Sequence, residues 1–148
     1  DINIRDIVKL IKSYEINVLG NYIFGFPEDT LDTMNETLDL AIELNCEHAN
    51  FYACQALPGS PLYTQALKQN LEIPKKYEEF AFLSYECKPM PTNYVSSKEV
   101  LKFRDDAWHK YFSNPNFLNL VKNKFGEENM NNVIKQSKIR LKRKLLGD

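Results

Sequence analysis

The expected fold depends most on one stretch of the sequence, Gly20-Asn21-Tyr22-Ile23-Phe24-Gly25-Phe26-Pro27-Glu28. Together with Val18 and Leu19 before it, the first part of this stretch is almost continuously apolar and has no helical periodicity. Such a run is typical of a parallel strand that is buried on both faces. Gly25-Phe26-Pro27 ends the run, and Asp29 or Thr30 is a suitable N-cap for a following helix. The stretch therefore predicts a strand at 18–24 that leads through a tight turn into a helix.

Elements on either side of this stretch extend the same pattern. Residues 3–14 carry apolar side chains at the spacing of an amphipathic helix, with Asn3 as its N-cap. The helix after the turn is expected to end at Asn45, and a second strand follows at His48–Gln55. A strand, a helix and a strand with short connections predict two parallel strands joined by a right-handed crossover.

The rest of the chain is predicted to be mostly helical. Capping residues and apolar spacing place further helices at about 60–70, 97–112, 117–125 and 127–146. The segment 71–95 is rich in proline and aromatic residues, and we expect it to cover the fold with one short helix or strand. The chain is therefore divided into a strand-bearing region, 1–70, and a mostly helical region, 71–148.

Two observations indicate the interior of a longer protein. Two parallel strands do not form a stable sheet alone, so further strands are expected from upstream sequence or from another chain. The chain begins Asp1-Ile2-Asn3, with neither an initiator Met nor the anatomy of a signal peptide. An isolated chain of this kind is expected to self-associate through an unpaired strand edge.

Composition narrows the function classes. The formal net charge is −1, which argues against bulk electrostatic binding of nucleic acid. No apolar run is long enough to cross a bilayer, and Cys46, Cys54 and Cys87 are expected to be reduced thiols in a cytoplasmic protein rather than a metal site. His48 and His109 are interpreted as ordinary histidines, and the basic run from Lys135 to Lys144 as a solvated face.

A functional site is expected at the carboxyl ends of the two strands, where ligands bind in α/β folds. Gly25 allows backbone to approach a ligand closely, and Glu28 places a carboxylate at the start of a helix. On pattern alone, the better interpretation is that Gly25 and Pro27 only make a tight turn. Polar side chains on the strands, at Asn21, Tyr22, Tyr52 and Gln55, are further candidates, although strand alternation sends only about half of them to one face.

Several segments, taken in order, resemble radical S-adenosylmethionine (radical-SAM) enzymes. Ile23, Gly25 and Glu28 match the loose fifth-strand motif GxIxGxxE, in which the first glycine is displaced to Gly20 or lost. Tyr52 to Gln55 is similar to the last strand, and Leu57-Pro58-Gly59-Ser60-Pro61-Leu62-Tyr63 is similar to the sequence after it. Pro91-Thr92-Asn93 and Phe103-Arg104-Asp105-Asp106-Ala107 resemble the trailing region of cobalamin-linked members.

This resemblance implies a fold, cofactors and site residues. The fold would be the C-terminal portion of a partial (β/α)6 TIM-like barrel with parallel strands, followed by a mostly helical extension. The cofactors would be S-adenosylmethionine and a [4Fe–4S] cluster held by CxxxCxxC, with cobalamin as a possible further group. Residues implied at the cofactor are Ile23, Phe24, Gly25, Glu28, Gln55, Ala56 and Leu57; those facing the substrate are Asn21, Tyr22 and Tyr52.

The chain departs from the family because CxxxCxxC is absent from its 148 residues, and its three cysteines are too widely spaced to replace that motif. The leading hypothesis is a fragment of a radical-SAM enzyme, inactive alone, completed by the upstream half of the same polypeptide and acting on a small-molecule or macromolecular substrate. The alternatives are a non-catalytic binding module and a fragment of an unrelated α/β barrel enzyme.

Overall fold

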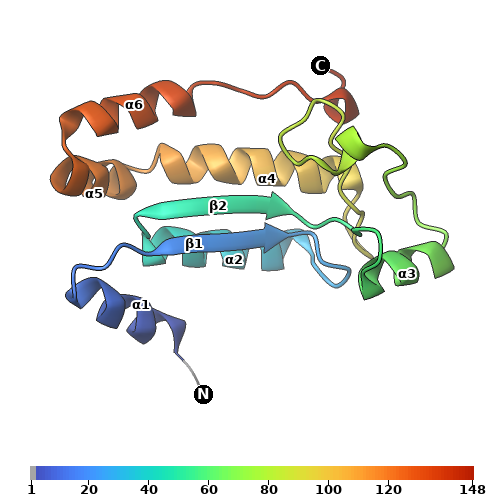
Figure 1. Ribbon diagram of the computed structural model, residues 1–148, viewed down its shortest axis with the longest axis horizontal. Helices are drawn as coiled ribbons and strands as arrows, with labels where there is room; N and C mark the ends of the chain where they lie inside the picture. The colour runs from blue at the N-terminus through green and yellow to red at the C-terminus, as the bar shows by residue number, and fades with distance from the viewer. Residues whose placement is uncertain (1–2) are drawn as a thin grey trace.

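Two parallel strands and the helices around them form the frame of the molecule (Figure 1). The structure is a computed structural model that describes residues 3–148. Its elements are α1 (Ile4–Ser13), β1 (Leu19–Phe24), α2 (Leu31–Leu44), β2 (His48–Ala53), α3 (Pro61–Lys68), the 3₁₀ turn η1 (Tyr77–Phe80), α4 (Ser97–Phe112), α5 (Pro115–Phe125), α6 (Glu127–Ser137) and the 3₁₀ turn η2 (Lys144–Leu146).

The predicted pair of parallel strands, connected through a helix, is confirmed. β1 and β2 are parallel and in register from the pair Leu19–His48 to the pair Phe24–Ala53, and α2 joins them. A capping box between Thr30 and Thr33 starts α2, because each side chain accepts a hydrogen bond from the other residue's backbone N–H. Asn45 ends the helix in the left-handed conformation, with φ of 45°, which asparagine tolerates better than most residues.

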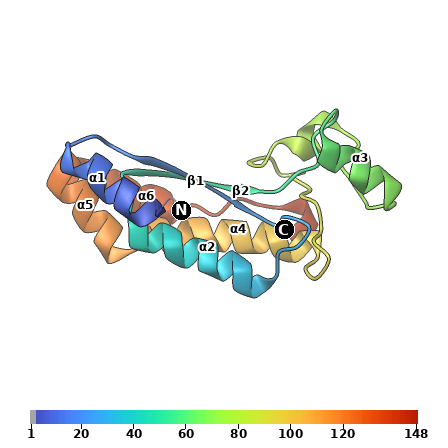
Figure 2. The ribbon, with the colours of Figure 1, turned by 90° about the horizontal axis from the view of Figure 1, so that it is seen from below.

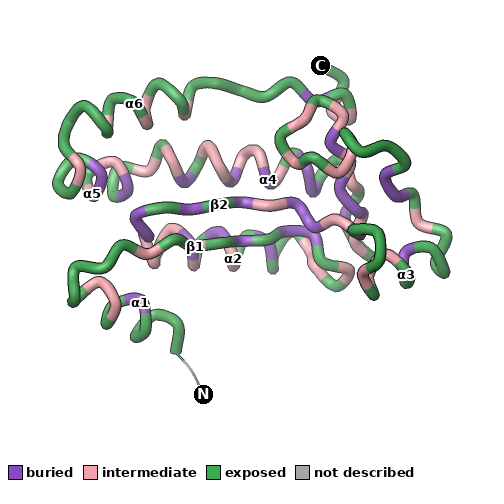
Figure 3. The backbone as a smooth tube through the Cα atoms, viewed as in Figure 1, coloured by how far each residue is buried: buried purple, intermediate pink, exposed green. Residues whose placement is uncertain are grey.

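The sheet has one covered face and one open face. Seen from below, α2 and α4 lie side by side across one face, while no helix within residues 3–148 covers the other (Figure 2). Alternate side chains follow this division, since Phe24 and Phe51 are fully buried whereas Leu19 and Ile23 are 52% and 42% exposed (Figure 3). The expectation of strands buried on both faces is therefore wrong within residues 3–148, because helices pack on one face only.

The expected partial (β/α)6 TIM-like barrel is also wrong for this chain. Residues 3–148 hold two parallel strands and six α-helices, so no barrel closes. After β2 the chain continues into helices, and Val100, Ala107 and Tyr111 of α4 pack in the core beneath the sheet. The result is one layer of two strands on one layer of helices, with α3 in a second small cluster formed by Ala56, Ala66, Ile73 and Met90.

Side chains of α4 donate hydrogen bonds to backbone carbonyls in β2 and in the loop before it. The Nε atom of Arg104 donates to the Phe51 carbonyl at 2.8 Å, and the Tyr111 hydroxyl donates to the Cys46 carbonyl at 2.7 Å. The opposite edge of the sheet, along β1, has no strand beside it in residues 3–148. The two edges of the sheet therefore differ in what is available to another strand.

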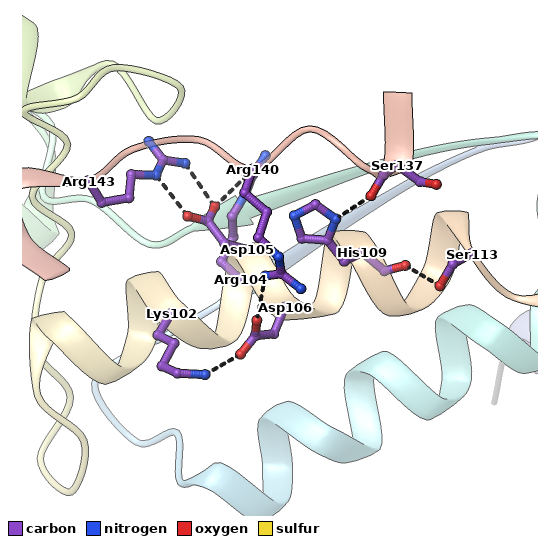
Figure 4. Close-up of polar contacts among 9 residues, drawn as sticks. All are labelled: Lys102, Arg104, Asp105, Asp106, His109, Ser113, Ser137, Arg140 and Arg143. Carbon is purple, nitrogen blue, oxygen red and sulfur yellow. Dashed lines mark hydrogen bonds and ion pairs between the residues drawn. The ribbon is translucent and has the colours of Figure 1, made fainter. Parts of the chain in front are cut away.

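The C-terminal segment departs from the predicted helix 127–146. Helix α6 ends at Ser137, and the chain then runs extended to η2. Arg143 is fully buried, and its Nε and Nη2 atoms donate to the two carboxylate oxygens of Asp105 at 2.7 and 2.8 Å (Figure 4). Its Nη1 atom donates to the Ser84 carbonyl at 2.7 Å. The interpretation of the basic run as a solvated face is wrong at Arg143, because a buried carboxylate draws that guanidinium inward.

Helix α1 forms where expected but buries little of its apolar side. Asn3 caps it as predicted, by accepting from the Arg5 N–H. Of its apolar stripe, Val8 is buried, whereas Leu10 is 60% exposed. Lys12 attaches the helix to the end of α2 by donating to the carbonyls of Leu44 and Asn45.

The main core draws on both predicted regions, since it runs from Tyr22 to Val121. The division of the chain at residue 70 stays a prediction. Among the described residues, no helix combines the length and the apolar character that a membrane span requires.

Candidate functional site

The turn after β1 is held together by its own polar groups. One carboxylate oxygen of Asp29, Oδ2, accepts from the backbone N–H groups of Gly25 and Phe26, at 2.9 Å each. Its other oxygen accepts from the Thr33 hydroxyl at 2.9 Å. Asp29 therefore links the end of the strand to the first turn of α2, and the Gly25 N–H is already used.

Gly25 is required by the fold at this turn. Its φ is +87°, in the left-handed region that favours glycine. A Cβ atom built on Gly25 would lie 2.5 Å from the Cγ1 atom of Val100 in α4, which is closer than packed carbon atoms approach. The structure thus supplies a reason for the glycine that involves no ligand. A larger side chain would disturb helix packing, so a substitution there cannot separate cofactor binding from folding.

Three residues of the predicted site lie inside the protein core. Phe24 is fully buried and stacks on Phe51, with ring centroids 5.9 Å apart. Tyr22 points to the same covered face, where burial and the neighbouring Cys46 raise the pKa of its phenol above the ordinary value. Ala56 is fully buried in the small cluster beside α3. None of these three side chains is exposed to a ligand in this conformation.

Other predicted residues meet on the open face of the sheet. Asn21 and Asn50 lie opposite each other in the strand register, and the Asn50 amide donates to the Asn21 side-chain oxygen at 3.1 Å. Ile23 follows Asn21 on the same face of β1. Tyr52 follows Asn50 on β2, where its ring packs edge-on against Phe82 at 5.0 Å between centroids. The open face therefore presents neutral polar groups beside an exposed apolar side chain.

The last three predicted residues lie past the strand ends. Gln55 is half-buried, and its amide donates to the Glu79 carbonyl at 3.3 Å and contacts Cys87 Sγ at 3.7 Å. Leu57 is 53% exposed, and Glu28 is exposed on the turn. Gln55 thus joins β2 to the covering segment, while Leu57 and Glu28 remain accessible.

The cysteines do not form a metal centre. Cys46, Cys54 and Cys87 are buried and unpaired by disulfides among the described residues. Burial, with a smaller contribution from Asp29, raises the pKa of Cys54 to about 11, and burial likewise raises the pKa of the other two thiols. Metal ligation requires thiolates, which these surroundings disfavour. Within residues 3–148 no three His, Cys, Asp or Glu side chains are grouped to share a metal ion, so this donor set does not fit a [4Fe–4S] cluster.

Sequence reasoning missed two features of this region. Asn50 was not singled out, although the parallel register places it directly opposite Asn21, a predicted site residue. Asp29 was expected only as a helix start, whereas its carboxylate also binds the end of β1. A register drawn for the two predicted strands would have identified Asn50. The double role of Asp29 depends on the turn geometry.

Comparison with known proteins gives one distant relationship. Over 113 residues, 76% of this chain, the sequence is 25% identical to the uncharacterized methyltransferase PH0819 of Pyrococcus horikoshii, of which the aligned part covers 24%. No family model and no solved structure matches the chain. The chain thus spans about a quarter of the length of this relative and is similar to part of a methyltransferase.

Proposed function

We propose that this chain is part of an S-adenosylmethionine-dependent methyltransferase of the radical-SAM type, in which the open sheet face lines the cofactor or substrate cavity. Two findings support the proposal: the similarity to a methyltransferase and the ordered segments that resemble radical-SAM enzymes. The observation that carries it is the open face itself. Ile23, near the carboxyl end of β1, and the Asn21–Asn50 pair, midway along the strands, are exposed there.

The chemistry of this face suits the adenosyl part of the cofactor. Ile23 offers an apolar surface to a flat ring, and the two asparagine amides offer donors and acceptors without net charge. Leu57, exposed past the end of β2, would close one side of such a site. Tyr22, Phe24 and Gly25 support this face from below through the core rather than by contact with the ligand.

Other parts of the reaction would come from outside this chain. A [4Fe–4S] cluster would have to be held by the upstream half of the same polypeptide, because the cysteines here do not fit one. Cobalamin, if the enzyme uses it, would likewise have to be held by the upstream half. The same upstream half would cover the open face and the free edge of β1, and the chain alone would be inactive.

Binding of S-adenosylmethionine by the whole reading frame tests the proposal. After anaerobic reconstitution, Ile23→Asp is expected to weaken binding of the radiolabelled cofactor by about tenfold or more, because it places a charge against the ring. Leu67→Asp is the matched control, since Leu67 on α3 is 52% exposed and is not a residue of the candidate site. Equal effects of the two substitutions, or the absence of CxxxCxxC upstream, would exclude the proposed role.

A non-catalytic binding module is the second candidate, and the exposed apolar side of α1 favours it. Such a module needs a docking surface and no cofactor. The binding module is the correct function if three results hold. The whole reading frame binds no S-adenosylmethionine, Ile23→Asp has no effect on partner binding, and Leu10→Asp releases a partner.

A further inference from the structure

A cavity of about 680 Å³ lies at the end of the sheet opposite to the candidate site. It is bounded by the amino end of β2 and by α5 and α6, which lie beside that end of the strand in Figure 1. This volume is in the range of small-molecule sites in proteins. Ile23, Gln55 and Leu57 of the candidate site do not line the cavity, whereas Asn50 does.

Aromatic and aliphatic side chains form the floor of the cavity. Phe117 and Val121 of α5 are buried there, and Phe112 and Phe125 contribute two further rings. Flat apolar walls of this kind suit a planar ring, because stacking and edge contacts add to the burial of apolar area.

Helix α6 lines the cavity with a row of amides. Asn129, Asn132 and Gln136 are spaced by three and four residues, so they share one side of the helix. Asn129 donates to the Phe125 carbonyl at 2.6 Å. The side chains of Asn132 and Gln136 make no hydrogen bond to any residue in the described part of the chain, and both remain available to a ligand.

The backbone of Ala49 provides a second pair of polar groups. The His48 N–H donates to the Val18 carbonyl and the Cys54 N–H to the Phe24 carbonyl, so even-numbered residues of β2 bond to β1. The N–H and C=O of Ala49 therefore point to the outer edge, where Ala49 lines the cavity. Neither group has a hydrogen-bond partner within residues 3–148. A donor and an acceptor thus lie side by side at the cavity wall.

The charged groups at the cavity neutralise each other. Glu47 lines it, but one carboxylate oxygen accepts from Lys124 at 2.9 Å and the other from the Val18 N–H at 2.9 Å. The hydrogen bonds from Val18 and Lys124 outweigh the opposing effect of burial and hold the pKa of Glu47 below its usual value. With this ion pair satisfied, the cavity favours an uncharged ligand.

We propose that this cavity binds an uncharged, flat heteroaromatic ring whose edge carries a hydrogen-bond donor next to an acceptor, as an aminopurine base does. The ring would lie on the Phe117–Val121 floor, its edge would pair with the N–H and C=O of Ala49, and Asn132 would bond its other side. The inference does not rest on the proposed methyltransferase function, because the cavity's aromatic floor and the Ala49 backbone groups belong to no part of the candidate cofactor site, with which it shares only Asn50.

Titration of the ¹⁵N-labelled chain with adenosine tests the proposal. We expect saturable shifts of the Ala49 and Asn132 amide signals, with those of Ile23 and Leu57 unchanged. N6,N6-dimethyladenosine lacks the donor edge and is expected to bind about tenfold more weakly. Shifts confined to Ile23 and Leu57 would assign adenosine to the candidate cofactor site instead and would overturn the cavity proposal.

Substitutions on α6 provide matched variants. Asn132→Leu removes an amide that lines the cavity, while Asn131→Leu makes the same change at an exposed neighbour that does not line it. Asn132→Leu is expected to weaken adenosine binding about tenfold and Asn131→Leu to leave it unchanged. Val133→Trp should fill the cavity and abolish binding, and a melting curve verifies its folding. No saturable shift at Ala49, or equal losses in the two leucine variants, would disprove the site.

Discussion

At the two ends of the chain, side-chain burial is the opposite of what the local composition suggests. Near the N-terminus, α1 has an apolar stripe, yet Leu10 and Tyr14 are 60% and 72% exposed. Near the C-terminus, the segment after α6 is dense in lysine and arginine, yet Arg143 is among the most deeply buried side chains. Burial here follows the availability of a partner. Asp105 on α4 pairs with the Arg143 guanidinium, whereas residues 3–148 cover Val8 on the apolar side of α1 but leave Leu10 and Tyr14 exposed.

Removal of the Arg143 side chain gives the largest expected effect. Arg143→Ala leaves the Asp105 carboxylate half-satisfied inside the protein and frees the Ser84 carbonyl. Breaking a buried ion pair on one side costs about 3–5 kcal/mol, so urea denaturation should show a loss of roughly 3 kcal/mol in the free energy of unfolding. Arg140→Ala is the control on the same segment, because Arg140 pairs with Asp106 at 3.5 Å while 71% exposed. The control should lose less than about 1 kcal/mol; comparable losses would mean that Arg143 is not buried.

Acid titration tests the Arg143–Asp105 ion pair by protonating the carboxylate instead of removing the arginine side chain. Burial pushes the pKa of Asp105 upward, but hydrogen bonds from Arg143 and Arg104 together outweigh it and hold the pKa below its ordinary value. A carboxyl with a lowered folded-state pKa contributes stability above its unfolded pKa of about 3.9, and this contribution is lost as the pH falls through the folded value.

We therefore expect Asp105→Asn to reduce the loss of stability between about pH 5 and about pH 2, although it destabilises the protein at neutral pH. Denaturant midpoints of the wild type and the variant at several pH values provide the measurement. An unchanged acid slope in the variant would show that Asp105 does not supply it.

Substitution on the exposed side of α1 gives the smallest expected effect. Leu10→Lys places a charge at a position that is already 60% exposed, so the free energy of unfolding should change by no more than about 0.5 kcal/mol. Val8→Ala, at the buried position of the same helix, should cost about 1 kcal/mol or more. Thermal melts of the two variants test this contrast. A large loss for Leu10→Lys would show that the apolar side of α1 is covered.

Local signals in the sequence identified most elements correctly. Asn3 is the N-cap of α1 as predicted, Thr30 is the one of the two predicted candidates that caps α2, and Asn45 stops α2. These features depend on neighbouring residues, so a single sequence contains them. The end of α6 could not be found in this way, because the ion pair that unwinds the following segment joins residues far apart in the chain.

The candidate site also combines features that neighbouring residues determine with features that depend on distant contacts. The register of two parallel strands follows from their lengths and connection, and it brings Asn21 to the open face. Which face of β1 the helices cover depends on α4, so the placement of Tyr22 and Phe24 in the core could not be read from the strand alone. The role of Gly25 likewise depends on Val100, a residue of α4 that is distant in sequence.

The contact between Arg104 and the Phe51 carbonyl has a consequence for assembly. It occupies one acceptor on the β2 rim, where the N–H and C=O of Ala49 stay free, so the β1 rim is the more open of the two to an added strand. Two copies that met through their β1 rims would form a pair with a partly occupied rim at each outer side, which hinders further growth. A chain with both rims free would instead propagate as a fibre. The arginine therefore disfavours growth of the self-associated species beyond a pair, and light scattering can measure the size of that species.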